Sequence, residues 1–194
     1  MQQLITKIRR CTLCASSLPL APKPILQASR DSKILIAGQA PGQVTHEKGV
    51  PFNDKSGERL RDWLGVTPAQ FYDPTLFAII PMGFCYPGKG KSGDLPPIPL
   101  CAETWRRPLL EQLPQIKLTI ILGKYAIDWH LSSKEPITAL AKQWQSLLKQ
   151  NTLVLPHPSP RNNLWLKKNP WFEQQLLPVL RHEVKQILFS ELHD

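Results

Sequence analysis

The 194-residue chain contains no apolar run as long as the roughly 18 residues that a membrane-spanning helix needs. Its first seven residues, MQQLITK, have no apolar stretch of the kind found in a signal peptide. Glycine is scarce, with 10 residues, which excludes collagen-like and low-complexity chains. Hydrophobic residues make up 42% of the chain, which is enough for a core and excludes intrinsic disorder. We therefore expect a soluble cytoplasmic protein with a single domain over residues 1–194.

Acidic residues are also few, because 15 Asp and Glu stand against 24 Lys and Arg, which leaves a net charge of +9. This excess favours a polyanionic partner such as nucleic acid, although many basic proteins bind none. Proline, in contrast, is abundant, and its 20 residues are about twice the usual share. Many of these prolines lie in the loops between predicted strands and helices, where they stiffen the backbone.

The sequence has only four cysteines, Cys11, Cys14, Cys85 and Cys101, and the first two form a C-x2-C pair. Disulfides are disfavoured in a reducing cytosol, so this set predicts a thiolate metal site that suits Zn or an iron–sulfur cluster. A thioredoxin-like redox pair would follow a strand, whereas residues 2–10 before the pair have a helical pattern. Four unrelated buried thiols are the alternative.

Four short apolar segments are typical of strands buried on both faces: residues 33–37, 76–81, 118–122 and 152–155. Helical patterns separate or flank them: residues 2–10, 56–64, 102–113, 124–131, 136–148 and a last helix from Asn169-Pro170. We expect Ser56 to cap the second helix, and Pro108 and Pro178 to kink theirs. The alternation of strands and helices predicts a three-layer α/β/α fold with a central four-stranded parallel sheet.

Loops rich in glycine, proline and polar residues follow three of these strands, at residues 38–42, 83–88 and 156–162. Carboxyl ends of parallel strands meet at one edge of a sheet, so these loops should form a ligand site there. Residues 83–90 also read G-x4-G-K-G, like a nucleotide-binding P-loop. However, Gly90 replaces the hydroxyl residue that binds Mg²⁺, and prolines follow in place of a helix. We interpret this segment as a basic, mobile surface loop.

Three motifs together resemble the uracil-DNA glycosylase superfamily: Gly38-Gln39-Ala40-Pro41-Gly42, Gly49-Val50-Pro51-Phe52 and His157-Pro158-Ser159-Pro160-Arg161-Asn162. The second and third are similar to the single-strand-selective monofunctional branch. The first, with the four cysteines, is similar to the iron–sulfur branch of bacteria and archaea. The resemblance implies a monomeric, nucleoid-associated enzyme of that three-layer fold that acts on DNA containing a damaged base. It also implies a [4Fe-4S] cluster, with Zn as the alternative, on Cys11, Cys14, Cys85 and Cys101.

The resemblance further implies roles for single residues. His157 would stabilise the leaving base anion, and Gln39 is the first candidate to position the attacking water, ahead of His46 and Glu47. Phe52 would stack on the extruded base. The remaining base contacts would come from Gly38, Ala40, Pro41, Gly42 and Asn53, and the DNA contacts from Ser159, Arg161, Lys167 and Lys168. Arg59 and Arg61 would meet phosphate or face solvent.

Two positions differ from the family pattern. Ala40 occupies the place of the Asp that positions water in the best-known members, and residues 79–84 lack the Asn that reads the uracil edge. Asn53 is the nearest substitute for that Asn. The resemblance still implies a monofunctional glycosylase for uracil or another deaminated base in DNA. The alternative is a catalytically weak or inactive member of the fold that binds DNA or a nucleobase.

Overall fold

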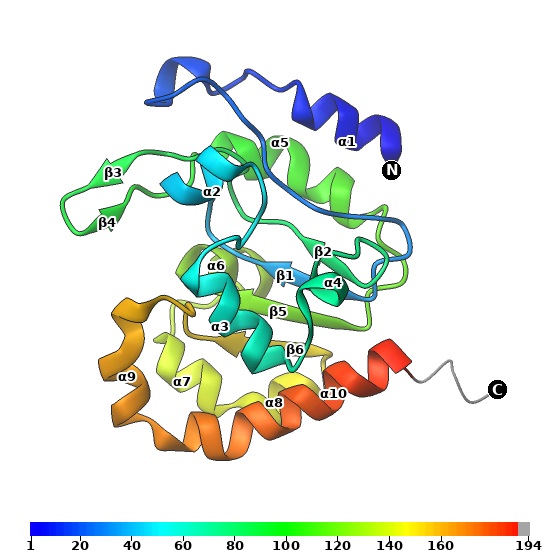
Figure 1. Ribbon diagram of the computed structural model, residues 1–194, viewed down its shortest axis with the longest axis vertical. Coiled ribbons are helices and arrows are strands. Elements are labelled where there is room, and N and C mark those ends of the chain that lie inside the picture. The colour runs from blue at the N-terminus through cyan, green and yellow to red at the C-terminus, as the bar shows by residue number, and fades with distance from the viewer. Residues whose placement is uncertain (190–194) are drawn as a thin grey trace.

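The computed structural model describes residues 1–189 and shows a four-stranded sheet between two layers of helices (Figure 1). All four strands are parallel, in the order β2–β1–β5–β6. The strands are β1 (Ile34–Ala37), β2 (Phe77–Ile79), β5 (Leu118–Leu122) and β6 (Thr152–Leu155). The predicted three-layer α/β/α fold with a central four-stranded parallel sheet is therefore confirmed. Residues 190–194 of the expected domain lie outside the described part of the chain.

Helices cover both faces of this sheet. One face is covered by α3 (Lys55–Leu64), the π-helical segment η3 (Phe172–Leu176) and α10 (Leu177–Phe189). The other is covered by α1 (Gln2–Arg9), α5 (Pro99–Leu110), α6 (Lys124–Leu131) and α7 (Ile137–Lys142). The shorter elements are η1 (Ala15–Ser17), α2 (Gln43–Lys48), α4 (Pro68–Phe71), β3 (Lys89–Gly90), β4 (Gly93–Asp94), α8 (Trp144–Leu148), η2 (Pro160–Asn162) and α9 (Asn163–Lys168).

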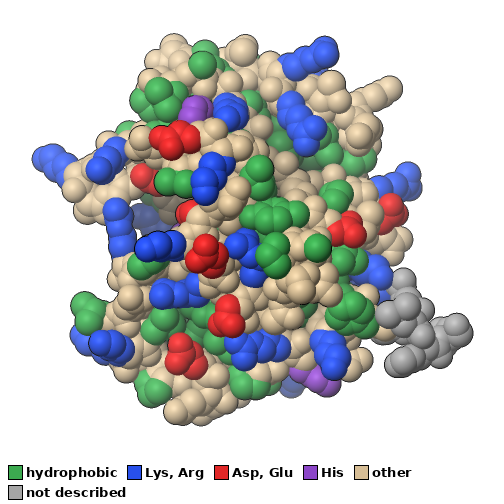
Figure 2. Space-filling model, viewed as in Figure 1, with side chains coloured by type: hydrophobic (Ala, Val, Ile, Leu, Met, Phe, Trp, Pro, Cys, Tyr) green, Lys and Arg blue, Asp and Glu red, His purple; other side chains and the backbone are tan. Residues whose placement is uncertain are grey.

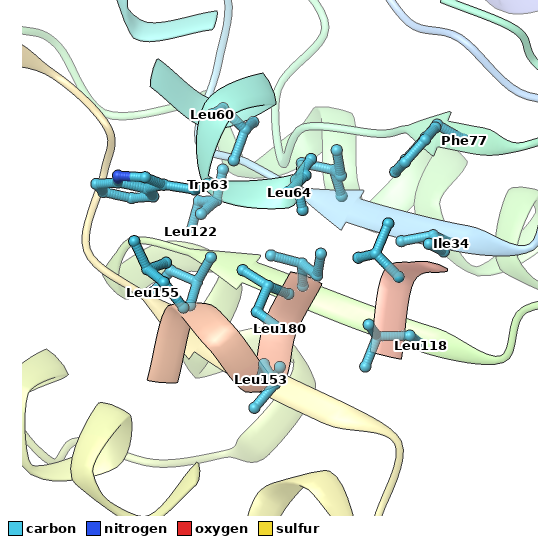
Figure 3. Packing of buried hydrophobic residues seen from close by; sticks show 14 of the residues in the cluster. Ile34, Leu60, Trp63, Leu64, Phe77, Leu118, Leu122, Leu153, Leu155 and Leu180 are labelled. Atoms are coloured by element: carbon cyan, nitrogen blue, oxygen red, sulfur yellow. The ribbon is translucent and has the colours of Figure 1, made fainter. Parts of the chain in front are cut away.

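The strands are apolar at successive positions because each face of the sheet has its own core. Ile34 and Ile36 of β1 belong to the core under α3 and α10, whereas Leu35 belongs to the core under α1 and α5. Figure 3 shows the first core, where Leu60 of α3 and Leu180 of α10 pack toward the strand side chains. Because helices cover both faces of the sheet, a ligand can reach the polar loops only at the edge where the strands end.

Helix boundaries differ from the prediction at several points. Asp54, and not Ser56, caps α3, since its side chain accepts a hydrogen bond from the Gly57 amide. The helix expected over residues 136–148 is divided into α7 and α8 at Gln143. Pro99 begins α5, earlier than expected, because proline suits the first position of a helix.

The last helix and the loop at residues 83–101 also differ locally from expectation. The turns just before Pro178 are π-helical, consistent with a proline that removes one backbone amide from the helical pattern. Part of the loop that we expected to be mobile forms the antiparallel hairpin of β3 and β4. None of the helices within residues 1–189 is both long and apolar enough to cross a membrane.

Candidate active site

A cavity of about 450 Å³ lies at the carboxyl ends of β1 and β6, a size that is typical of small-molecule sites. Its walls come from the loop after β1, from residues 51–56, from the loop after β6 and from the β3–β4 hairpin. The predicted residues that line it are Gly38, Gln39, Ala40, Pro41, Gly42, Phe52, His157, Ser159 and Arg161. The structure therefore brings the three sequence motifs together around one space.

Three predicted contact residues lie outside the lining of this cavity. Asn53 is exposed and is not part of the cavity wall, and its backbone carbonyl accepts a hydrogen bond from Lys48. Lys167 and Lys168 are exposed on α9, next to the loop that carries His157. The two lysines therefore lie outside the cavity wall, and the base-reading role expected of Asn53 stays a prediction that the cavity lining does not support.

The loop after β1 is held by the chain that follows β2. The carbonyl oxygen of Gly38 accepts a hydrogen bond from the Met82 amide, and that of Gln39 accepts one from the Gly83 amide, both at 2.9 Å. Gly38 is buried, and a Cβ atom at this position would lie 3.8 Å from Cζ of Phe52. The Phe52 ring therefore borders the Gly38 backbone, as expected of two groups that face the same ligand.

Phe52 has a backbone conformation that non-glycine residues rarely adopt, with φ of 53°. Its carbonyl oxygen accepts hydrogen bonds from Arg61 at 3.2 Å and from the Tyr72 hydroxyl at 3.1 Å. The same oxygen lies 1.6 Å from where a Cβ atom on Gly57 would be, so only glycine fits there. Arg61 thus holds the strained Phe52 backbone, a role that the sequence did not indicate.

His157 is a neutral hydrogen-bond donor in this geometry. Its Nδ1 atom accepts a hydrogen bond from the Ser159 amide at 3.2 Å, which assigns the ring proton to Nε2. Burial lowers the pKa of His157, although the nearby carboxylates of Asp54 and Asp94 act in the opposite direction. The side chain of Asn162 donates to the His157 carbonyl at 2.7 Å and so holds the loop. His157 therefore keeps an N–H group for a ligand in the cavity.

Two carboxylates that the sequence analysis did not select, Asp54 and Asp94, also line the cavity. Asp54 could have been found, because it lies two residues after the GVPF motif and caps the helix that follows. Asp94 could not, since the hairpin brings it close to Gly42, whose Cβ atom would lie 3.3 Å from its Oδ2. His46 and Glu47 do not line the cavity, and Glu47 is exposed.

Two arginines hold the loop after β6 against neighbouring segments. Arg59, which is half-buried, donates to the Ser159 carbonyl at 3.1 Å and to the Asn163 side chain at 2.8 Å, so part of its guanidinium is bonded within the protein. Arg161 extends to the hairpin, where Nη1 lies 3.4 Å from the Ser92 carbonyl. A Cβ atom on Gly93 would approach that nitrogen to 2.7 Å. The Arg161 contact closes one side of the cavity.

Basic side chains surround this region of the surface. Figure 2 shows Lys and Arg side chains on the projecting hairpin and over α9, on both sides of a hollow. Lys89 and Lys91 are exposed on the hairpin. Trp165 of α9, by contrast, packs against the core, and its indole N–H donates to Thr138 at 2.8 Å. The lysines and Arg161, and not this tryptophan, make the rim suited to a polyanion.

The four cysteines line a second, smaller cavity. Cys11 and Cys14 follow α1, Cys85 follows β2, and Cys101 lies in the first turn of α5. All four are free thiols, and two of their sulfurs accept hydrogen bonds: Cys11 from the Trp105 indole at 3.3 Å and Cys101 from the Phe84 amide at 3.4 Å. N–H groups directed at sulfur are a common feature of thiolate metal sites.

Burial raises the pKa of the Cys14, Cys85 and Cys101 thiols, that of Cys101 to about 12. Such thiols keep their protons until a metal displaces them. Within residues 1–189, no group of three or more Cys, His, Asp or Glu side chains is placed closely enough to hold a metal ion. The four thiols that line this cavity are the donor type that a thiolate-bound group takes.

Comparison with protein-family models matches residues 26–181 to the Uracil DNA glycosylase superfamily. The match covers well over half of the chain and includes every residue that lines the first cavity except Ile25. It leaves Cys11 and Cys14 outside, so it carries no information about the N-terminal part of the cysteine site.

Proposed function

Because the chain belongs to the Uracil DNA glycosylase superfamily, we propose that it is a monofunctional glycosylase that removes uracil or another deaminated base from DNA. One observation carries the proposal. An aromatic ring, Phe52, and a neutral histidine donor, His157, border the same cavity of about 450 Å³ at the edge of the sheet. The two ring centroids are 6.4 Å apart. A base that is extruded from DNA needs a stacking surface and a donor to its edge in this combination.

The reaction breaks the bond between the sugar carbon C1′ and the base nitrogen, and the bonding electrons move to the base. In our proposal the Nε2–H of His157 donates to the base oxygen on which negative charge develops. Phe52 holds the base by stacking, which contributes about 1–3 kcal/mol. Water then bonds to C1′ and its proton leaves, so that the products are the free base and an abasic site.

Asp54 and Asp94 are the best candidates to orient that water, in place of Gln39. A carboxylate can accept a hydrogen bond from the attacking water and can also stabilise positive charge that develops on the sugar. The amide of Gln39 can orient the water, but it carries no charge for the second role. Both carboxylates line the cavity, in a site where Ala40 supplies no polar side chain. Gln39 then contributes hydrogen bonds to the base or to the water.

We propose that DNA lies across the basic rim around this cavity. Lys89 and Lys91 on the hairpin, Arg161 beside it, and Lys167 and Lys168 on α9 would contact phosphates. Such contacts position a duplex or single strand without reading its sequence. The reading of the base would then be confined to the cavity.

We also propose that the four thiols bind a [4Fe-4S] cluster, with a single Zn ion as the alternative. The four thiols come from separate segments and line one cavity, and thiolates are the donors that both groups take. When bound, the cluster would bond to the four thiolates and would join the N-terminal segment, the chain after β2 and α5.

Gel assays on oligonucleotides that contain uracil, hypoxanthine or xanthine, single- and double-stranded, test the proposed activity. His157→Ala should lower the rate by about 10²–10³-fold, as loss of an oxyanion donor does. His182→Ala, a change of an exposed histidine on α10, serves as the control. If none of the three bases gives an abasic product, the proposed glycosylase activity is refuted. Tight DNA binding without turnover would support the alternative of a binding protein.

Anaerobic purification tests the metal proposal separately. A brown protein with a broad visible absorbance band, iron and sulfide would support the cluster. A colourless protein with one zinc per chain would refute it.

A further inference from the structure

Arg106 of α5 is completely buried, with an exposed fraction of 0%, and its guanidinium bonds to the chain that follows β2. Its Nη1 atom donates to the carbonyl oxygens of Ile80 at 3.0 Å and Pro81 at 3.1 Å. Its Nη2 atom lies 2.6 Å from Nε2 of His130. Its Nε atom has no hydrogen-bond partner in the described part of the chain. The guanidinium is therefore held by two backbone carbonyls and one imidazole ring.

These three partners are neutral groups. Burial lowers the pKa of His130 to about 3, and the charge of Arg106 acts in the same direction. The ring is therefore neutral at physiological pH, and its Nε2 atom can accept the hydrogen bond from Nη2. Burial also lowers the pKa of Arg106, to about 10, which leaves the guanidinium charged. Because a buried charge among neutral groups is destabilising, packing alone does not account for an arginine at this position.

The Pro81 carbonyl that Arg106 binds belongs to a peptide unit that also holds the loop after β1. The other end of this peptide unit is the Met82 amide, which donates to the Gly38 carbonyl at 2.9 Å. Arg106 and Gly38 therefore bind the same peptide unit, one at its oxygen and the other at its N–H group. A charged donor at the carbonyl polarises the peptide and strengthens the hydrogen bond that its N–H group donates.

The segment that Arg106 holds forms part of the base cavity. Pro81, Gly38 and Gln39 all line that cavity. The Gly83 amide adds a second bond between the two segments, because it donates to the Gln39 carbonyl at 2.9 Å. Arg106 itself is not among the residues that line the cavity. Any effect of Arg106 on a bound base must therefore pass through this backbone.

We propose that Arg106 is a positioning residue for base removal: it fixes the Pro81–Met82 peptide unit, which in turn fixes Gly38 and Gln39 beside the extruded base. The inference rests on the proposed function, because it concerns the geometry of that cavity. A displacement of about 1 Å in this backbone is enough to lower the rate of the chemical step.

Three variants separate positioning from packing. Arg106→Met removes the charge and the donors, Arg106→Lys keeps a charged donor without the planar fork, and Arg107→Met changes the exposed arginine next to it as the control. Each is purified anaerobically and compared at equal metal content per chain. All are measured at a temperature at which circular dichroism shows every variant folded. The substrate is whichever oligonucleotide, with uracil, hypoxanthine or xanthine, the wild type cleaves fastest.

Arg106→Met should lower the single-turnover rate at saturating enzyme by about 10²-fold. DNA affinity, measured by fluorescence anisotropy, should stay at the wild-type value, because the basic rim is unchanged. Amide hydrogen exchange at Met82 should become faster, since its peptide unit loses the bond to Arg106. Arg106→Lys should recover part of the rate, and Arg107→Met should match the wild type in all three measurements.

A lower thermal midpoint in Arg106→Met with a wild-type single-turnover rate would overturn the inference and leave Arg106 a packing residue. Equal rate losses in Arg106→Met and Arg106→Lys would also overturn it, because a donor to the carbonyls would then have no effect. A wild type that releases none of the three bases would instead refute the proposed glycosylase activity, and the positioning role with it.

If Arg106→Met does not fold, Arg106→Lys is compared with His130→Leu, which removes the acceptor of Nη2 and leaves the guanidinium without its orienting partner. Both variants should then have a smaller loss of single-turnover rate at wild-type DNA affinity. Wild-type rates in both would overturn the inference.

Discussion

Gly57→Ala tests whether the strained backbone of Phe52 is essential for the proposed base cavity. A Cβ atom on Gly57 would lie 1.6 Å from the Phe52 carbonyl oxygen, whereas real Cβ atoms essentially never come closer than 3.0 Å. One of the two segments must then move by about 1.4 Å, the difference between these distances. Gly57 lies in the first turn of α3, held by its hydrogen bond to Asp54, so the displacement falls mainly on Phe52.

The consequence has two parts. The Phe52 carbonyl would lose its hydrogen bonds from Arg61 and Tyr72, at about 1 kcal/mol each, or roughly 2 kcal/mol of stability in total. For a chain of this size that corresponds to a fall in Tm of about 4–8 °C. The Phe52 ring would also shift within the cavity, and a displacement of about 1 Å in an active site can lower kcat/KM by about 10²-fold.

Both effects are measured against Glu58→Ala, an exposed change one residue further along α3. Thermal denaturation gives Tm, and single-turnover cleavage of a uracil-containing oligonucleotide separates the chemical step from binding. If Gly57→Ala and Glu58→Ala have the same Tm and the same kcat/KM, the Phe52 carbonyl does not need the space, and the reasoning is wrong.

Three further predictions concern protonation, catalysis and DNA binding. Burial and the charge of Arg106 lower the pKa of His130 to about 3 in the folded protein, whereas the unfolded chain protonates this ring below about pH 6.5. The free energy of unfolding should therefore fall as the pH is lowered from about 6.5 to about 3. Urea titrations over this pH range should show a smaller fall in His130→Gln. Asp54→Asn retains the helix cap and Asp94→Asn retains the shape, so a rate loss of about 10²-fold in at least one, at unchanged Tm, would identify the water-orienting carboxylate. Normal rates in both would exclude these carboxylates. Changing Lys89 and Lys91 to Gln should reduce the slope of log K against log salt by about 1 for each lysine that contacts phosphate, and an unchanged slope would place DNA elsewhere.

The main features of the fold could be predicted because they depend on local patterns. Continuous apolar segments identify buried strands, and the bounds of β5 and β6 agree with the predicted residues 118–122 and 152–155. Loop composition after β1 and β6 also predicted which segments meet at one edge of the sheet. The short α2, α4 and α9 and the β3–β4 hairpin were missed, since elements of two to six residues have little periodicity of their own.

The roles of polar side chains near the site could be predicted less well. Arg61 looked like a surface cation and instead holds the Phe52 carbonyl. Asp94 lies 52 positions from Gly42 in the sequence, yet its carboxylate lies beside it. The sequence did not indicate that Arg106 is buried. Its side chain donates to the Ile80 and Pro81 carbonyls just after β2, a contact that its neighbours along α5 do not reveal.

The sequence by itself determined the order and type of the main elements, the loops that share the cavity and the cysteines that converge. Only the tertiary structure decided which polar groups have hydrogen-bond partners within the protein and which remain available to a ligand. Arg59 and the Ser159 carbonyl are 100 residues apart, and Trp105 and Cys11 are 94 apart. The physical reason is that apolar periodicity reports the burial of a segment, whereas each polar pairing depends on distances that exist only after segments far apart in the chain have packed.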